Sequence, residues 1–296
     1  MTSATPATHA HDNHPIDGRV TCQNCDHDYT GRYCNQCGQR ADTHPVSWHY
    51  IWHEIPHSVW HIDRGIAYTL RQLLTRPGHT IREFLEGKRI NHYRPLALLL
   101  ILGAVVVFVQ HGLDVSIMKS SQGAFGTPNA DASARIQAFQ AQAFAFIERN
   151  QNLINIATIP LYAFWLWFMF RRRGYNYPQM LVAQTFIANF GLVVSLTVTL
   201  LMWLLGSSPA IFRAVMSFTL LALIGYLVVV CLQLFRGKLP ARSIVFRSIA
   251  AWVLAYLNYM LIAGLIGVGY GIYVGYQEGQ AHKITKPATT TQQPHK

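Results

Sequence analysis

The sequence predicts an all-α polytopic membrane protein of about five transmembrane helices, preceded by a small four-cysteine ribbon and amphipathic juxtamembrane helices. Composition is the first reason: 51% of the 296 residues are hydrophobic and only 12% are charged, whereas soluble proteins average about 25% charged residues. The second reason is five apolar runs, each near the roughly 20 residues that a helix needs to cross a bilayer. They are Pro95–Leu113, Leu153–Phe170, Met180–Leu205, Ala210–Phe235 and Ser248–Tyr276.

The Lys and Arg residues between these runs predict the orientation of the chain. Ten precede Pro95, three lie at Arg171–Arg173 and four lie from Arg236 to Arg247, which places 17 of 24 on one side of the five spans. The positive-inside rule assigns that side to the cytoplasm. We therefore expect a protein of the bacterial cytoplasmic (inner) membrane, with its N-terminus in the cytoplasm and its C-terminus outside.

Composition changes along the chain predict five regions. Residues 1–18 are polar and rich in histidine, which is typical of a disordered tail, and they lack the apolar core of a cleavable signal peptide. A ribbon is expected at 19–42, amphipathic interfacial helices at 43–94, the five-span domain at 95–276 and a polar tail at 277–296. Within the five-span domain, apolar residues on one face of 132–149 predict an amphipathic helix on the outer surface.

Four cysteines have the spacing of a metal site. Cys22, Cys25, Cys34 and Cys37 form C-x2-C-x8-C-x2-C, a pattern in which two short knuckles present four thiolates to one zinc ion. Cytoplasmic thiols stay reduced, which disfavours disulfides. Redox chemistry or iron is the weaker alternative. Because four thiolates leave no open position, the predicted zinc ribbon holds one structural Zn²⁺ and no catalytic metal.

A histidine stripe follows the ribbon, with His49, His53, His57 and His61 each four residues apart. Interleaved tryptophans favour an amphipathic segment in the headgroup region. The alternative is a second metal site at His53 and His57, which also fit the H-E-x-x-H pattern of zinc proteases. Pro56 lies between these two histidines and disrupts the helix that such a site requires.

Two basic amphipathic helices are expected before the first span. In Gly65–Thr75, the residues Ile66, Leu70, Leu73 and Leu74 are expected on one face. In the following PGHTIREFLEGKR, Thr80 and Glu83 form a capping-box pattern and Gly87 ends the helix. Cations beside a membrane attract anionic lipid headgroups. We predict that four residues contact lipid or a partner: Arg82, Lys88, Arg89 and Arg94. Nucleic acid is a less favoured ligand for this charge.

The ribbon and the second helix together carry a family resemblance. The start C-x2-C, G-x-Y-C-x2-C-G-Q, the segment DRGIAYTLRQLLTRPGHTIREFLEGKR, and Tyr93 and Pro95 before an apolar span resemble bacterial membrane proteins of domain-of-unknown-function family 3667. The resemblance extends from Cys22 to about Leu100. It implies an N-terminal zinc ribbon and several spans, and it implies no known activity. It is carried in the second helix by Pro77, Arg82, Gly87, Lys88 and Arg89.

Inside the spans, the polar residues are almost all uncharged amides, which more often join helices than line a transport path. Two overlapping G-x-x-x-G units, Gly267–Gly271 and Gly271–Gly275, predict close helix contact within one chain or between copies in a homo-oligomer.

These features favour a membrane scaffold or adaptor over an enzyme, and we expect its zinc ribbon and basic helices to bind an unknown cytoplasmic protein partner or anionic lipid headgroups. A transporter of a small solute or metal is the first alternative, because the chain combines a histidine-rich N-terminal region with five spans. A membrane metalloprotease that uses His53 and His57 is the second alternative, and it rests on the H-E-x-x-H match alone.

Overall fold

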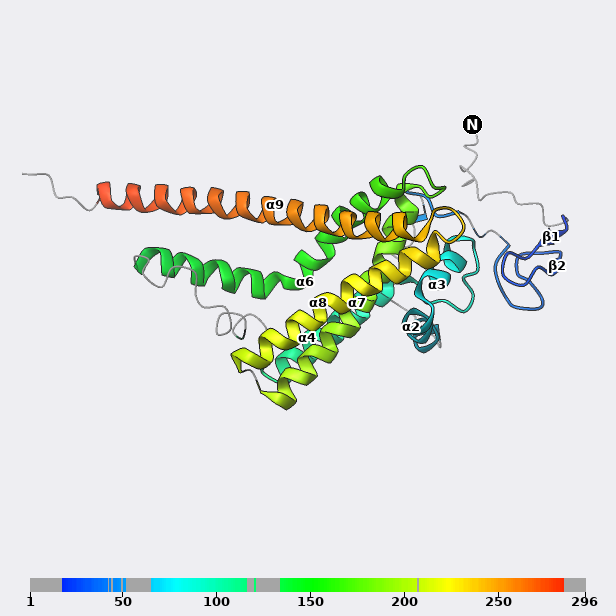
Figure 1. The fold of residues 1–296 in the computed structure, drawn as a ribbon, viewed down its shortest axis with the longest axis horizontal. Coiled ribbons are helices and arrows are strands. Elements are labelled where there is room, and N and C mark those ends of the chain that lie inside the picture. The colour runs from blue at the N-terminus through cyan, green and yellow to red at the C-terminus, as the bar shows by residue number, and fades with distance from the viewer. Residues whose placement is uncertain are drawn as a thin grey trace, which may run out of the picture.

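The computed structural model describes residues 18–41, 43, 45–48, 50–51, 65–115, 120, 134–206 and 208–284. Two short strands lie near the N-terminus and helices make up most of the rest (Figure 1). The elements are β1 Val20–Thr21, β2 Asp28–Tyr29, α2 Gly65–Thr75, α3 Pro77–Leu85, α4 Pro95–Gly112, α6 Ala134–Phe170, α7 Tyr177–Leu205, α8 Pro209–Leu234 and α9 Ala241–Ile284.

Five of the described helices are long and apolar enough to cross a membrane, which confirms the predicted fold class. Their candidate spans are Pro95–Gly112, Leu153–Phe170, Tyr177–Leu205, Pro209–Leu234 and Ala241–Tyr273. Successive spans run in opposite directions, so the start of α4 and the end of α8 lie at the same end as α2, α3 and the ribbon (Figure 1). The protein is therefore an integral membrane protein with its cysteine ribbon at one end of the helices.

Helix α7 is central to the packing, since it contacts α4, α6 and α8, while α9 packs on α6 and α8. The main core lies where α3 and the ends of α6, α7 and α8 meet, around the fully buried Phe84, Phe186 and Phe235. The rings of Phe84 and Phe186 pack edge to face with centroids 5.2 Å apart. The juxtamembrane helix α3 is thereby part of the same core as the spans.

Buried amides join helices inside the spans. Asn189 of α7 is fully buried, and its side-chain Nδ2 donates a 2.9 Å hydrogen bond to the carbonyl oxygen of Pro95 at the start of α4. Farther along the same pair of helices, Gln110 Nε2 donates to Thr199 Oγ1 at 3.3 Å. Such bonds hold two helices in register where no water competes.

The structure departs from the sequence-based expectations at three helices. The expected outer helix 132–149 and the second span are one continuous helix, α6, because residues 149–153 contain neither glycine nor proline to end it. Helix α9 extends to Ile284, into the expected polar tail. On α2, Leu74 is mostly exposed, while Leu73 is buried, so the apolar face is narrower than predicted.

The start of α3 was also predicted wrongly. The helix begins at Pro77, with Arg76 as N-cap residue and no side-chain cap, rather than at a Thr80 cap. Proline suits the first helical position because its missing N–H is not needed there. Thr80 instead lies inside the helix and its hydroxyl donates to the carbonyl oxygen of Arg76 at 3.1 Å. Glu83 is left to pair with other residues.

The glycines of α9 are not used for close contact within the chain at the positions that can be examined. A Cβ added at Gly264, Gly267 or Gly269 would meet no atom within 4 Å. Pairing of α9 between two copies of the protein, through Gly267, Gly271 and Gly275, stays a prediction.

Candidate metal centre and its docking segment

The ribbon (residues 19–41) is built from two knuckles of the same design. In the first, Cys22 N–H donates to the carbonyl oxygen of His27, and Asp26 N–H donates back to that of Cys22, both at 2.9 Å. In the second, Cys34 pairs with Gln39 and Gly38 in the same way, at 2.8 Å. Asp26 and Gly38 occupy matching positions, and both have positive φ, 58° and 79°. Glycine and aspartate tolerate this conformation better than most residues.

The two knuckles bring the four predicted ligands together. The Sγ atoms of Cys22, Cys25, Cys34 and Cys37 all lie within 4.8 Å of one another. Cys22 and Cys37 are 3.5 Å apart at sulfur, and Cys25 and Cys34 are 3.6 Å apart. A tetrahedral site with Zn–S bonds of about 2.3 Å has sulfur atoms about 3.8 Å apart. The separations are far longer than the roughly 2.05 Å of a disulfide, so the cluster fits a metal ion.

The ribbon backbone favours one thiolate in this cluster. Burial raises the pKa of Cys34, but backbone N–H groups of Cys37 and Gln36 and the neighbouring thiols outweigh it and lower the pKa to about 6. For Cys25, the backbone N–H of His27 lowers the pKa, whereas burial and the neighbouring sulfur atoms raise it to about 12. Cys34 therefore loses its proton before its neighbour Cys25, as expected when several thiols share a small space.

Aromatic side chains divide between the inside and the outside of the ribbon. Tyr29 is buried beside Cys22 and Cys34. Tyr33 is 59% exposed, and it forms an antiparallel bridge with Arg40. Arg32 is also exposed. The second knuckle thus exposes Tyr33, its bridge partner Arg40 and its sequence neighbour Arg32.

Gln39 connects the ribbon to the segment that follows α3. Its side chain is buried, Nε2 donates to the carbonyl oxygen of Gly87 at 2.8 Å, and Oε1 accepts from Arg89 N–H at 3.1 Å. One amide therefore satisfies both a carbonyl and an N–H of the same turn, as a strand partner would. This pair fixes the ribbon on the docking segment, residues 77–89.

The turn at the end of α3 has the shape that this docking needs. Gly87 has φ of 100°, Lys88 N–H donates to Glu83 O at 2.9 Å, and Gly87 N–H donates to Phe84 O at 3.2 Å. These two bonds form a Schellman motif, so Gly87 ends the helix as predicted. A Cβ at Gly87 would lie 2.0 Å from Oε1 of Gln23 in the ribbon. Glycine is needed here for both the conformation and the contact.

At its other end, the docking segment packs tightly on α8. Gly78 N–H donates to Oε1 of Gln233 at 2.8 Å, and His79 Nδ1 lies 3.2 Å from the same oxygen. A Cβ added at Gly78 would lie 2.4 Å from Cβ of Gln233. Sequence reasoning missed this role of Gly78, although a glycine after proline in a helical segment is a signal of close approach.

The Arg82 side chain caps the C-terminal end of α8. Its guanidinium Nη2 donates to the carbonyl oxygens of Gln233 and, at 2.8 Å, of Leu234. These are the last carbonyls of the helix, which lack intrahelical partners and carry partial negative charge. Arg82 also favours the ionised form of the neighbouring Tyr175, whose pKa is nevertheless raised by burial. The guanidinium is thus engaged within the protein.

The other three predicted contact residues differ in their surroundings. The guanidinium carbon of Arg89 lies 4.5 Å from the ring centre of Tyr50 and 5.1 Å from that of Phe84, and Arg89 Nε donates to the carbonyl oxygen of Phe84. Lys88 is half-buried and Arg94 is exposed at the start of α4. Lipid or partner contact through these residues stays a prediction.

A buried imidazole, His92, lies between the docking segment and α4. Its Nε2 lies 3.5 Å from Oε2 of Glu83, and Oε1 of the same carboxylate lies 3.7 Å from Nη1 of Arg76. Burial lowers the pKa of His92, and Glu83 raises it by a smaller amount. The sequence analysis missed this pair because Glu83 matched a capping pattern instead.

The predicted second metal site cannot be placed, because His53 and His57 lie outside the described residues, as do His49 and His61. Among the described residues, the four cysteines are the one group of three or more metal-ligating side chains close enough to share an ion.

Comparison with known proteins gives one match. The model of the family described as Protein of unknown function (DUF3667) matches residues 63–107. No curated protein and no solved structure matches the chain. The matched segment contains α2, α3 and most of α4, and it does not reach the four cysteines. Over residues 63–107, which include the docking segment, the resemblance to the DUF3667 proteins is therefore confirmed.

Proposed function

We propose that this protein is a scaffold of the bacterial inner membrane, in which one Zn²⁺ holds a cytoplasmic ribbon rigid and the ribbon presents a binding face to a cytoplasmic protein. The observation that carries the proposal is the Gln39 amide pair with Gly87 and Arg89. It attaches the four-cysteine cluster to the docking segment, which in turn is attached to α8 through Gly78 and Arg82. The ribbon is held in one position relative to the spans.

Zinc is the ion that best suits this cluster. Four sulfur ligands in a tetrahedral arrangement select zinc or iron among the common metals, and a closed four-thiolate site without redox partners is typical of structural zinc. Among the described residues of the two-stranded ribbon, the apolar core has three buried side chains, Cys22, Tyr29 and Cys34. So small a core supplies little folding energy, and the metal supplies the rest.

The partner-binding face is the outer side of the second knuckle. Tyr33 is exposed there, with the exposed Arg32 and Arg40 beside it. Tyrosine and arginine are enriched among the residues that contribute most to binding at protein interfaces, and two arginines favour an acidic partner surface. The orientation follows from the positive-inside rule, and Lys88 and Arg94 add contacts to anionic headgroups on the same side.

The test is site-specific crosslinking in cells from a photoreactive residue at Asn35, which is exposed beside Tyr33. We expect a discrete crosslinked protein with the otherwise unaltered chain. It should be lost with Cys34→Ser/Cys37→Ser, which removes the metal, and with Tyr33→Ala, which keeps the metal. Arg19→Ala, at an exposed arginine just before β1, is the control and should keep the crosslink. A crosslink that survives in a demonstrably zinc-free variant would refute the proposal.

A further inference from the structure

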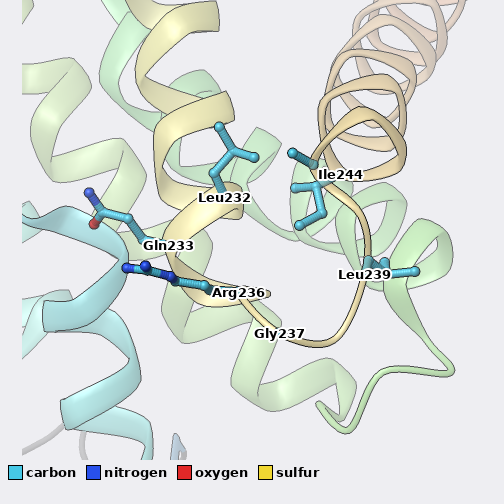
Figure 2. Close-up of a pocket in the computed structure, with 7 residues that line it drawn as sticks. Leu232, Gln233, Arg236, Gly237, Leu239 and Ile244 are labelled. Atoms are coloured by element: carbon cyan, nitrogen blue, oxygen red, sulfur yellow. The ribbon is translucent and has the colours of Figure 1, made fainter.

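A hollow of about 320 Å³ opens at the turn between α8 and α9 (Figure 2). The proposed scaffold function does not involve this hollow. The turn is short, from Phe235 to Pro240, and Gly237 within it has φ of 79°. Seven residues line the hollow: Leu232, Gln233, Arg236, Gly237, Leu239, Ala241 and Ile244.

The lining is divided into an apolar part and a polar part. The apolar part consists of Leu232 on α8, Leu239 on the turn and Ile244 at the start of α9, whereas Gln233 and Arg236 extend toward α3 (Figure 2). The Arg236 side chain is exposed, and among the described residues no carboxylate pairs with it. The exposed Arg236 guanidinium lies on the α3 side of the turn, and it meets a ligand in this hollow when its flexible side chain turns toward α9.

The stretch of chain that forms the hollow carries cations and no acidic residue. Between Glu148 and Glu278 the chain has no acidic residue at all, yet Arg171–Arg173, Arg236, Lys238, Arg242 and Arg247 all belong to this stretch. Arg171 lies over the ring of Phe168, and Arg247 and Lys238 donate hydrogen bonds within the protein. Arg247 Nη1 donates to the carbonyl oxygen of Met169 at 2.6 Å, and Lys238 Nζ donates to that of Arg173 at 3.2 Å. Arg236 and Arg242 are exposed and remain available to an external anion.

The position of the hollow selects a lipid as the source of that anion. It lies where the candidate spans of α8 and α9 end and begin, at Leu234 and Ala241. Immediately beyond it on α9, Phe246 is 73% exposed and Ile249 is also exposed, as expected for a surface that faces hydrocarbon. A cationic group beside apolar walls at this depth matches the boundary between a lipid phosphate and its acyl chains.

We propose that this hollow is a binding site for an anionic phospholipid of the leaflet on the ribbon side. The phosphate lies at the Arg236 guanidinium, and the glycerol and the first acyl carbons lie against Leu239 and Ile244. The site is separate from the ribbon face and does not depend on the protein partner proposed above. Removal of the ribbon metal by Cys34→Ser/Cys37→Ser should leave lipid binding intact.

The experiment is native mass spectrometry of the full chain in detergent, titrated with phosphatidylglycerol and separately with phosphatidylcholine. We expect one phosphatidylglycerol molecule to bind more tightly than the other phosphatidylglycerol molecules and more tightly than phosphatidylcholine. Because one arginine near a membrane surface changes affinity by about fivefold, Arg236→Gln should weaken this lipid by about that factor. Arg172→Gln, an exposed arginine at the same end that does not line the hollow, is the control and should leave its affinity unchanged.

A second variant tests the hollow rather than the charge. Ala241→Trp fills the space from an exposed position while every arginine is kept, so it should also expel the tight lipid. Equal losses in Arg236→Gln and Arg172→Gln would mean non-specific attraction and would overturn the site. Unchanged lipid binding in Ala241→Trp would also overturn the site. Displacement of the lipid by millimolar inorganic phosphate would overturn it as well, because it would identify a site for a free anion.

Discussion

The α-carbon of Gly78 is so close to Gln233 that no other residue fits without a shift of the backbone. The Cβ that alanine would add lies 2.4 Å from Cβ of Gln233 and 2.5 Å from the carbonyl oxygen of Val230. The Gly78 N–H donates to the Gln233 side chain in the same contact. The position of α3, and with it the position of the ribbon, therefore depends on a glycine in this segment.

Gly78→Ala should destabilise the protein by roughly 1–3 kcal/mol, the usual cost of forcing a methyl group into a packed contact. The measurement is the fraction of protein that stays monodisperse after heating in detergent. Gly103→Ala is the matched control, because this glycine is also helical and a Cβ there meets nothing within 4 Å. That variant should be neutral or slightly more stable. Equal behaviour of the two variants would contradict the close approach of α3 to α8.

Gln39→Glu should release the ribbon from the docking segment while it retains its metal. A carboxylate has the same shape as the amide but cannot donate to the carbonyl oxygen of Gly87, which is then left unpaired at a cost of about 1–3 kcal/mol. The expected result is faster protease cleavage around residue 40 with unchanged zinc content. Gln36→Glu, at an exposed position of the same knuckle, should change neither. Slow cleavage in both variants would show that the amide pair does not hold the ribbon.

Arg82→Met should weaken the attachment of α3 to α8, because the last carbonyls of α8 lose their cationic partner. A cation at a helix C-terminus contributes about 0.3–1 kcal/mol at the surface and up to about 2 kcal/mol when partly buried. Hydrogen exchange at the end of α8 should become faster. Arg71→Met, an exposed arginine on α2, supplies the comparison. Faster exchange in both, or in neither, would argue against a specific role for Arg82.

The sequence predicted the five spans and the cysteine cluster because both depend on local pattern. A run of about 20 apolar residues can be read directly, and C-x2-C pairs bring their thiols together through the knuckle between them. The first and last residues of the helices were predicted less accurately. The joining of 134–149 to the second span in α6 depends on the absence of a helix-breaking residue, which the amphipathic pattern alone does not reveal.

Contacts between distant segments could not be derived in this way. Gln39 is 48 residues from Gly87, and Arg82 is 152 residues from Leu234. A basic amphipathic helix beside a membrane favours a lipid-bound interpretation, and only the packing reveals that the apolar face of α3 is buried in the protein core. Arg82 was predicted to contact lipid or a partner for the same reason, and only the packing reveals that its guanidinium donates to the last carbonyl oxygens of α8.

Acid should loosen the junction of α2, α3 and α4 through His92. Burial lowers the pKa of His92 in the folded protein. The unfolded chain therefore binds a proton at His92 more readily than the folded protein does near pH 6.5. The neutral buried imidazole favours folding only above that pH. This stabilisation is lost as the pH falls below about 6.5 toward the lowered pKa. His92→Phe keeps an aromatic ring near Tyr68 and Phe84 but cannot titrate. Thermal stability of the variant should fall less between pH 7 and pH 5 than that of the wild type, and an equal fall would exclude His92 as the cause.

Elemental analysis of the purified full-length protein decides between one metal and two. We expect about one zinc per chain, because four thiolates close the coordination sphere. The ion should be lost in Cys34→Ser/Cys37→Ser and on acidification, since protons compete with the metal for the thiolates.

The variant His53→Ala/His57→Ala should contain the same single zinc as the wild type. Two metals in the wild type, falling to one in this variant, would instead establish a site in the histidine stripe. Transport of a metal or hydrolysis of a peptide would then become a better account than a scaffold, because that second site, unlike the ribbon, would have ligand positions open to water or substrate.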